Sequence, residues 1–256
     1  MKAEIIAVGT ELLLGDIVNT NAPWISKALS KIGVDVFYHT AVGDNPTRIK
    51  QIVAQALERS DILIFTGGLG PTEDDLTIAT LADYFDVSMI SDPASEKAIA
   101  SFFIARGMQH SKSNLKQALR PEDARVIDNP IGTAPGIFWD VSSKTGRQNW
   151  ILTFPGVPKE LYAMWEQGQD YLLESSELQG VSARVLHSES LHFFGIGEST
   201  LGEKLTDLMQ QANPTVAPYV GRSEVRVRVS AKAESPEQAK QLIAPVKAEI
   251  ITRLSD

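Results

Sequence analysis

The chain has 256 residues, a formal net charge of −8, 43% hydrophobic and 22% charged residues, and no cysteine. Its length predicts one large domain, or one domain with a smaller companion, and its apolar content is enough for a sizeable core. The acidic balance means that nucleic acid is not expected as a partner. The lack of cysteine excludes disulfides, thiolate metal sites and cysteine nucleophiles. Because no apolar run has the length of a signal peptide or a membrane span, we expect a cytoplasmic protein with no membrane partner.

Apolar runs and helical spacings alternate in the first part of the chain. They predict the order strand, helix, strand, helix, strand at residues 5–8, 25–32, 34–41, 49–57 and 61–65. Residues 12–21 are expected to form a loop in which Asn19, Thr20 or Asn21 caps the first helix. Uninterrupted apolar strands in this order predict an α/β fold with a mostly parallel sheet between two helical layers.

The third strand leads into the stretch TGGLGPTEDDLT at residues 66–77. Three glycines in five residues allow a sharp turn and a close approach of the backbone to a ligand. We expect a helix to begin directly after this turn, so that free N–H groups face an anion. The adjacent carboxylates of Asp74 and Asp75 suggest a divalent cation that reconciles them with a phosphate. The plainer alternatives are a simple turn and acidic residues that stabilise the first turn of a helix.

Further polar segments are predicted near the same edge of the sheet, because ligands of parallel sheets bind beyond the carboxyl ends of the strands. Residues 111–121 are polar and basic, and they either reach the ligand or form a solvated loop, which is the interpretation that this segment alone favours. The turn-rich NPIGTAPG at 129–136 precedes a predicted hairpin with strands at 137–141 and 149–154. The second strand runs into PGVPKE, where Glu160 either faces the ligand or is an ordinary acid of a first helical turn.

The composition changes at residues 174–180, which we interpret as a linker to a second domain. Beyond it, extended and helical patterns predict the order β-α-(β)-β-α and a small α+β domain. Residues 224–232 alternate strictly, which places Arg226 and Arg228 on the wet face of a strand. We interpret these arginines as solvated rather than as a nucleic-acid surface, because no exposed aromatic residue is interleaved with them.

The motifs GTELLLGDIVNTN, TGGLGPTEDDLT, NPIGTAPG and FPGVPKEL occur in an order that resembles the N-terminal region of the CinA (competence/damage-inducible) family. The resemblance implies a molybdopterin-binding, MoaB/MogA-like three-layer αβα domain over residues 1–174. It also implies a KH-type α+β domain over residues 181–256, where FGIGEST and NPTVAPY are similar to the family. The sequence GIGE departs from the GxxG with basic neighbours that clamps RNA.

The resemblance further implies an activity, which is hydrolysis of ADP-ribose to AMP and ribose 5-phosphate. It implies a divalent cation, cobalt or magnesium, with potassium assisting, and a homodimer. Full-length relatives often add a nicotinamide mononucleotide amidohydrolase domain, and we expect no deamidase activity from this chain. A pterin- or nucleotide-binding module without hydrolysis is the alternative, and adenylyl transfer to molybdopterin ranks last.

Roles follow for individual residues as hypotheses. Asp74 and Asp75 are predicted to hold the cation, and either Glu160 or Asp44 orients or deprotonates the attacking water. Glu11 contacts sugar hydroxyls or joins the metal shell. The other predicted substrate and phosphate contacts are Asn21, Thr66, Gly67, Gly68, Gly70, Thr72, Lys116, Asn129, Gly132, Thr133, Pro155 and Gly156.

Overall fold

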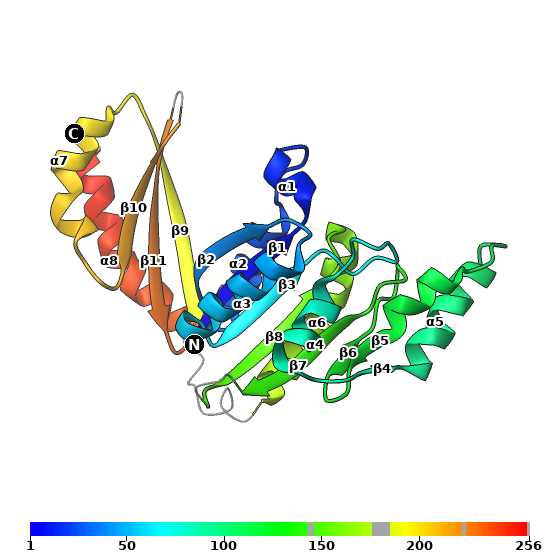
Figure 1. Cartoon of the computed structure of the whole chain (residues 1–256). Helices are drawn as coiled ribbons and strands as arrows, with labels where there is room; N and C mark the ends of the chain where they lie inside the picture. The colour runs from blue at the N-terminus through cyan, green and yellow to red at the C-terminus, as the bar shows by residue number, and fades with distance from the viewer. Residues whose placement is uncertain (143–145, 176–184, 222–223, 255–256) are drawn as a thin grey trace. The chain divides into compact units, whose positions relative to one another are not determined.

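The computed structural model describes residues 1–142, 146–175, 185–221 and 224–254, which form two compact units (Figure 1). The larger unit contains β1 (Lys2–Val8), α1 (Thr10–Leu14), α2 (Asn21–Lys31), β2 (Asp35–Val42), α3 (Pro46–Arg59), β3 (Ile62–Thr66), α4 (Thr77–Phe85), β4 (Met89–Ser91), α5 (Pro93–Ile104), the 3₁₀ helix η1 (Lys112–Ala118), β5 (Leu119–Pro121), β6 (Arg125–Ile127), β7 (Gly136–Ser142), β8 (Gln148–Phe154) and α6 (Pro158–Glu174). The smaller unit contains β9 (Val185–Phe194), α7 (Glu198–Met209), β10 (Thr215–Val220), β11 (Glu224–Ala233) and α8 (Pro236–Leu254). Among the described helices, none combines the length and apolar character needed to cross a bilayer.

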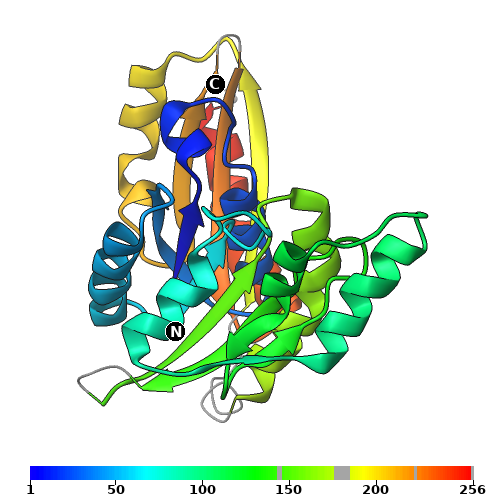
Figure 2. The same ribbon diagram turned by 45° about the vertical axis from the view of Figure 1, so that its right-hand side comes forward.

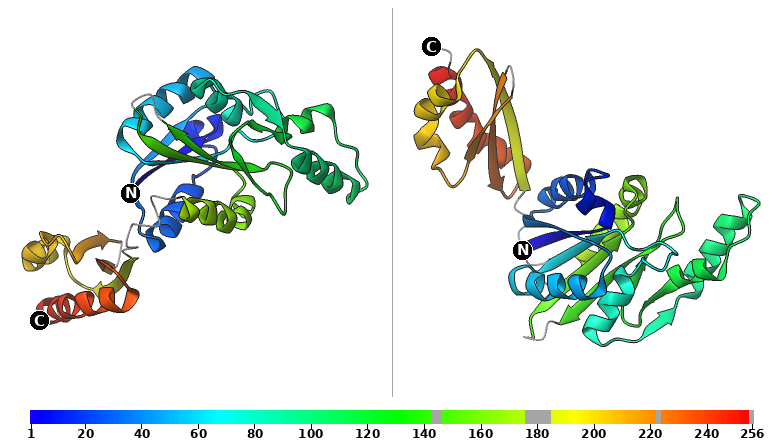
Figure 3. Two further views of the ribbon diagram at one scale, coloured as in Figure 1. Left: turned by 90° about the horizontal axis from the view of Figure 1, so that it is seen from below. Right: turned by 45° about the horizontal axis from the view of Figure 1, so that its top comes forward.

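A six-stranded sheet with the order β2-β1-β3-β8-β7-β6 organises the larger unit. The first four strands in this order are parallel, and β7 and β6 continue the sheet antiparallel. Helices α3 and α4 cover one face and α2 and α6 the other, as the left view of Figure 3 shows. The predicted mostly parallel three-layer sheet is therefore confirmed, as is the predicted hairpin of β7 and β8.

The apolar runs of the sequence become the buried strands of this sheet. Every residue of β3 is buried, and so is every residue of β1 after Lys2. Both faces of these strands lie under helices, which explains why their sequences are mostly apolar rather than alternating, with Glu4 as the buried charged exception in β1. Trp139 and Trp150, from the hairpin, are each 2% exposed within the same layer.

A short helix, α1, replaces part of the loop expected at residues 12–21. The backbone N–H and the hydroxyl of Thr10 both donate to Asp44 Oδ2 at 2.8 Å. The helix has five residues and buries none of them, so the sequence carries no apolar periodicity there. The expected cap of α2 is confirmed, since Asn19 Oδ1 accepts from the N–H of Ala22 at 3.0 Å.

The segment from β4 to β5 stands away from the main sheet (Figure 2). The strands β4 and β5 pair antiparallel, and α5 and η1 lie between them in the chain. The expectation of a solvated loop at 111–121 is wrong, because η1 and β5 occupy it and bury Gln117 and Ala118. The N–H of Ser111 donates to Asn114 Oδ1 at 2.9 Å at the start of this turn.

The smaller unit is an antiparallel sheet of order β10-β11-β9, with α7 and α8 packed on one face (Figure 1). The alternation in β11 is confirmed: Val225, Val227 and Val229 are buried, while Arg226 and Arg228 are exposed. No aromatic residue is interleaved with these arginines within β11, but the neighbouring strand β10 supplies one. Cross-strand pairing places the ring of Tyr219 4.9 and 5.0 Å from the two guanidinium carbons. The predicted linker lies mostly outside the described residues.

Candidate functional site

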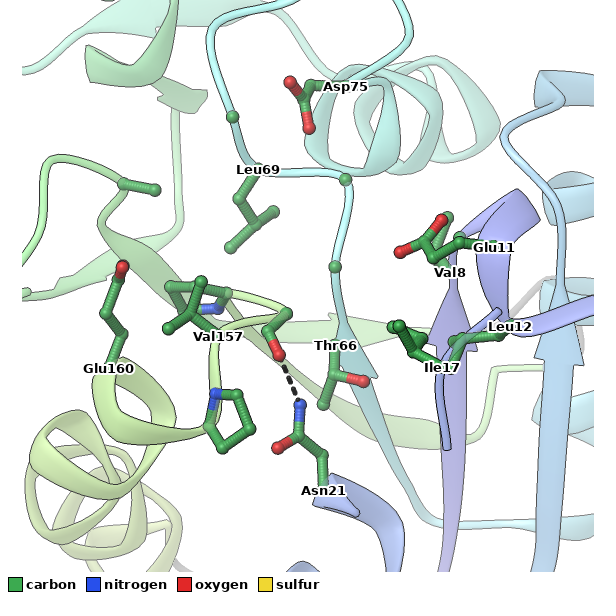
Figure 4. Close-up of a pocket in the computed structure, with 18 of the residues that line it drawn as sticks. Val8, Glu11, Leu12, Ile17, Asn21, Thr66, Leu69, Asp75, Val157 and Glu160 are labelled. Carbon is green, nitrogen blue, oxygen red and sulfur yellow. Dashed lines mark hydrogen bonds between the residues drawn. The ribbon is translucent and has the colours of Figure 1, made fainter. Parts of the chain in front are cut away.

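A pocket of about 760 Å³ opens at the carboxyl ends of the parallel strands (Figure 4). Val8 at the end of β1 and Thr66 at the end of β3 line its floor, and Pro155 follows β8 beside them. The segment after β1 forms one wall, and the start of α6 forms the opposite wall. The chain thus gathers its motifs at the sheet edge where they were predicted to meet.

The glycine turn after β3 has a conformation that only glycine adopts without strain. Gly67 and Gly68 have φ values of 98° and 66°. A Cβ on Gly67 would lie 2.1 Å from the carbonyl oxygen of Val8, and one on Gly68 would lie 2.2 Å from Thr77 Oγ1. The Thr77 hydroxyl donates to the Gly67 carbonyl at 2.9 Å, and its N–H donates to the Gly68 carbonyl at 3.2 Å. These contacts fix the turn against β1 and α4.

Backbone N–H groups of this turn are left free at the pocket. Gly67 donates its N–H to the Phe154 carbonyl at 3.0 Å, and Thr72 donates its N–H to Asp75 Oδ2 at 2.9 Å. Between them, Gly68, Leu69 and Gly70 donate to no acceptor among the described residues, and all three line the pocket. The predicted helix after this motif is confirmed as α4, which begins at Thr77, but the free donors lie in the turn before it and do not include Thr72.

Asp74 and Asp75 lie together beside the turn. The hydroxyl of Thr72 contacts Asp74 Oδ1 and lies 2.5 Å from Asp75 Oδ2, yet it has a single hydrogen to donate. The hydrogen bond from Thr72, the N–H of Asp74 itself and the charge of Lys116 lower the pKa of Asp74 below its ordinary value. Lys116 also donates to the Thr72 carbonyl at 2.7 Å. Two carboxylates held this close favour a cation between them.

The two candidates for the base differ in their surroundings. Asp44 Oδ2 already accepts two hydrogen bonds from Thr10 and so serves the start of α1. Glu160 Oε2 accepts from Asn129 Nδ2 at 2.7 Å, while its Oε1 accepts from no group among the described residues. A Cβ on Gly132 would lie 2.3 Å from Glu160 Oε2, so the carboxylate fits only because a glycine lies beside it. Each candidate therefore keeps one oxygen, Glu160 Oε1 or Asp44 Oδ1, that accepts no hydrogen bond among the described residues.

The ionisable side chains of the pocket are all acidic. The lining carboxylates are those of Glu11, Asp44, Asp74, Asp75 and Glu160, and no Lys, Arg or His lines the pocket among the described residues. In the described part of the chain, no three His, Asp or Glu side chains are grouped so that they could hold a metal ion by themselves. One or two carboxylate oxygens completed by substrate phosphates and water suit Mg²⁺.

Most of the predicted site residues line this pocket, and four do not. Thr72 and Lys116 lie behind the aspartate pair, where they hydrogen-bond to it or to its backbone. Asn129 and Gly132 line a neighbouring pocket of about 140 Å³, which shares Thr133 with the large one. The glycine turn, the aspartate pair, segment 129–136 and the start of α6 thus all line one pocket, segment 129–136 through Thr133 and Ala134, while Asn129 itself reaches it through Glu160.

Several pocket residues were not predicted. Gln117 is 7% exposed and donates to the Leu69 carbonyl at 3.1 Å, which supports the glycine turn from 48 residues away. Nothing local in the sequence signals this contact.

Asn21 was expected to contact the substrate, and its Nδ2 also donates to the Gly156 carbonyl at 2.8 Å, which ties α2 to the loop before α6 (Figure 4). Of the remaining unpredicted lining residues, Asn19 and Thr20 are polar, and the apolar ones include Leu12, Ile17, Val18 and Val157.

Comparisons with known proteins match both units. The family described as probable molybdopterin binding domain matches residues 4–173, and the damage-inducible protein CinA KH domain matches residues 188–256. CinA-like proteins of Nostoc punctiforme and Trichodesmium erythraeum are 50% and 51% identical to the chain over 98% of its length. The chain spans only 58% and 57% of those relatives.

A solved structure gives the same result. The crystal structure of CinA from Thermoplasma acidophilum is 34% identical and has a TM-score of 0.60. The match covers 67% of this chain and 99% of that one. Together, the two family matches, the relatives and this structure show that the chain belongs to the CinA family, with a molybdopterin-binding domain followed by a KH domain.

Proposed function

We propose that this pocket hydrolyses the pyrophosphate of ADP-ribose, with a divalent cation, to AMP and ribose 5-phosphate. The supporting observation is the run of free N–H groups at Gly68, Leu69 and Gly70, next to paired carboxylates. Consecutive backbone N–H groups form a concave donor surface that suits phosphate oxygens. The acidic lining repels a diphosphate unless cations accompany it, so the same pocket explains a requirement for metal.

The chain's own residues divide the work. The N–H groups of the turn would bind one phosphate, and Asp74 and Asp75 would hold the cation together with the substrate. A bound divalent cation neutralises phosphoryl charge and lowers the pKa of water. Thr72 and Lys116 keep Asp74 ionised, because both favour its charged form.

Glu160 is the group that we assign to the attacking water. Its free Oε1 accepts the water proton while the water oxygen bonds to one phosphorus and that phosphorus loses its bond to the bridging oxygen. The bridging oxygen leaves with the other phosphate, which completes AMP and ribose 5-phosphate. Asn129 orients Glu160 through Oε2, and Asp44 is left to hold α1.

A second candidate is binding of a pterin or nucleotide without hydrolysis. The family match over residues 4–173, described as a probable molybdopterin binding domain, favours it. One fold hosts many activities, so the fold does not separate the two candidates. Retention of ligand without turnover, in the presence of magnesium or cobalt, is the result that selects this candidate.

The test is turnover of ADP-ribose with magnesium or cobalt by the wild type and by Asp74→Asn, Asp75→Asn and Glu160→Gln. We expect each substitution to lower the rate by at least about 100-fold, because a metal or a proton acceptor contributes several kcal/mol to the barrier. Glu73→Gln is the matched control, since Glu73 is exposed in the same loop and does not line the pocket. Full activity of all three variants removes the assignment, and equal loss in the control shows a nonspecific effect of charge.

A further inference from the structure

We propose that the apolar side chains after β1, facing Val157, form the subsite for the planar base of the nucleotide. The inference rests on the proposed function, because that function places the diphosphate at the glycine turn. The pocket volume of about 760 Å³ lies within the range of small-molecule sites and exceeds what a diphosphate with its cation fills. The space beyond the turn is bounded by Leu12, Ile17 and Val18 on one side and by Val157 on the other.

The apolar side chains of this wall are exposed to solvent, which contributes nothing to the stability of the folded chain. Ile17 is 52% exposed, Val18 is 83% exposed and Val157 is 52% exposed. Helix α1 buries none of its own residues, so this segment does not build the core. Covering large aliphatic side chains is favourable by roughly 25 cal/mol for each Å² removed from water. A flat heteroaromatic ring between the two walls supplies that cover.

Asn21 lies at the end of the pocket away from Asp75 (Figure 4). Its hydrogen bond to the Gly156 carbonyl joins the two walls at the floor of the pocket, and Figure 4 shows Ile17 and Val157 on opposite sides of it. Asp75 and the glycine turn lie at the other end of the view. An uncharged base suits this acidic pocket, because a second anionic group beyond the turn would meet no cationic side chain among the described lining residues.

Neighbouring side chains of the same segment provide a matched comparison. Leu13 is 53% exposed and Leu14 is 72% exposed, yet neither lines the pocket. If exposure alone mattered, as in contact with a second copy of the chain, Leu13 and Leu14 would matter as much as Ile17 and Val18. If the base is the occupant, only the pocket-lining pair matters.

The experiment measures binding of AMP and of ribose 5-phosphate, with magnesium present, by isothermal titration calorimetry. The whole chain carries Ile17→Ser with Val18→Ser, or Leu13→Ser with Leu14→Ser as the control. We expect the first pair to raise the Kd for AMP about tenfold and to leave ribose 5-phosphate unchanged, because only AMP carries a base. The control pair should leave both affinities unchanged. All four positions are exposed or line the open pocket, and circular dichroism checks the fold.

Other outcomes overturn the proposal. The base does not bind at this wall if the Ile17→Ser, Val18→Ser variant keeps its AMP affinity or loses affinity equally for AMP and ribose 5-phosphate. The same conclusion follows if the Leu13→Ser, Leu14→Ser control has an equal effect. A change of sedimenting mass in the Ile17 and Val18 variant, with AMP affinity unchanged, assigns the wall to a second copy of the chain. ADP-ribose turnover by the wild type is assayed separately. If the wild type hydrolyses no ADP-ribose but the Ile17→Ser, Val18→Ser variant selectively loses AMP affinity, the proposed reaction is refuted and the base subsite stands.

Discussion

Replacing Gly67 by alanine tests the packing of the glycine turn most directly. Its φ of 98° lies in the left-handed region, and the added methyl would lie 2.1 Å from the carbonyl oxygen of Val8. Both atoms belong to backbone, one at the turn and the other at the end of β1, so no flexible side chain can move aside. Either the turn or the strand end must shift.

The cost has two parts. An alanine in the left-handed region costs about 1–2 kcal/mol. Relieving the contact to an ordinary separation of at least 3.4 Å needs a shift of about 1 Å, and overpacking of this kind costs about 1–3 kcal/mol. We therefore expect Gly67→Ala to lower the free energy of unfolding of the larger unit by about 2–5 kcal/mol.

Urea unfolding followed by tryptophan fluorescence measures this cost, because Trp24, Trp139, Trp150 and Trp165 all lie in the larger unit. Gly107→Ala is the matched control: its φ is 67°, and a Cβ there meets nothing within 4 Å. It carries the conformational cost alone, about 1–2 kcal/mol. Equal midpoints and equal slopes for the two variants would refute the steric reasoning, since only Gly67 opposes the Val8 carbonyl.

Two further substitutions test the electrostatics. Thr72→Val removes the main hydrogen bond that lowers the pKa of Asp74, so this pKa should rise toward its ordinary value and the carboxylate should be protonated at a higher pH than in the wild type. Thr72→Ser keeps the hydroxyl and should leave this pKa unchanged. The measurement is a ¹³C NMR titration of the carboxyl groups from about pH 2 to 6, and the same Asp74 pKa in the wild type and Thr72→Val would contradict the reasoning. Arg59→Met removes the bidentate partner, at 2.8 and 2.9 Å, of Glu4, which is 0% exposed, and should cost about 3 kcal/mol in the same urea assay. Arg125→Met removes an exposed partner of Glu174 and should lower the free energy of unfolding by less than about 1 kcal/mol. Similar losses of stability in Arg59→Met and Arg125→Met would contradict the idea that burial makes the Glu4 ion pair the more costly one to break.

The parts of the fold that follow from periodicity could be predicted from the sequence. The buried strand β3 is apolar from Ile62 to Phe65, and the spacing of Ile49, Val53 and Leu57 marks one face of α3. Helix α1 could not be predicted in this way, because it buries none of its residues and is fixed by Asp44 from another segment.

The candidate site shows the same division. The glycines and carboxylates that meet in the pocket are adjacent in the sequence or follow parallel strands, so their meeting could be predicted. The contacts of Gln117 and Tyr219 could not be predicted. Each of these side chains contacts residues of another element, and the local sequence does not show which elements lie side by side. The hydrogen-bond partners of Asp44 and Glu160, which are Thr10 and Asn129, likewise come from other segments of the chain.

The partner of β3 has a consequence for synthesis of the chain. Ile62 pairs with Trp150, so β3 lacks this neighbouring strand until the ribosome has added 88 more residues. At about 5–20 residues per second, this interval lasts several seconds. During this time the nascent β1-β2-β3 segment presents a fully apolar, unpaired strand edge to other chains. Closely spaced ribosomes, or loss of a chaperone that binds nascent chains, should therefore lower the yield of folded protein even when the stability of the finished fold is unchanged.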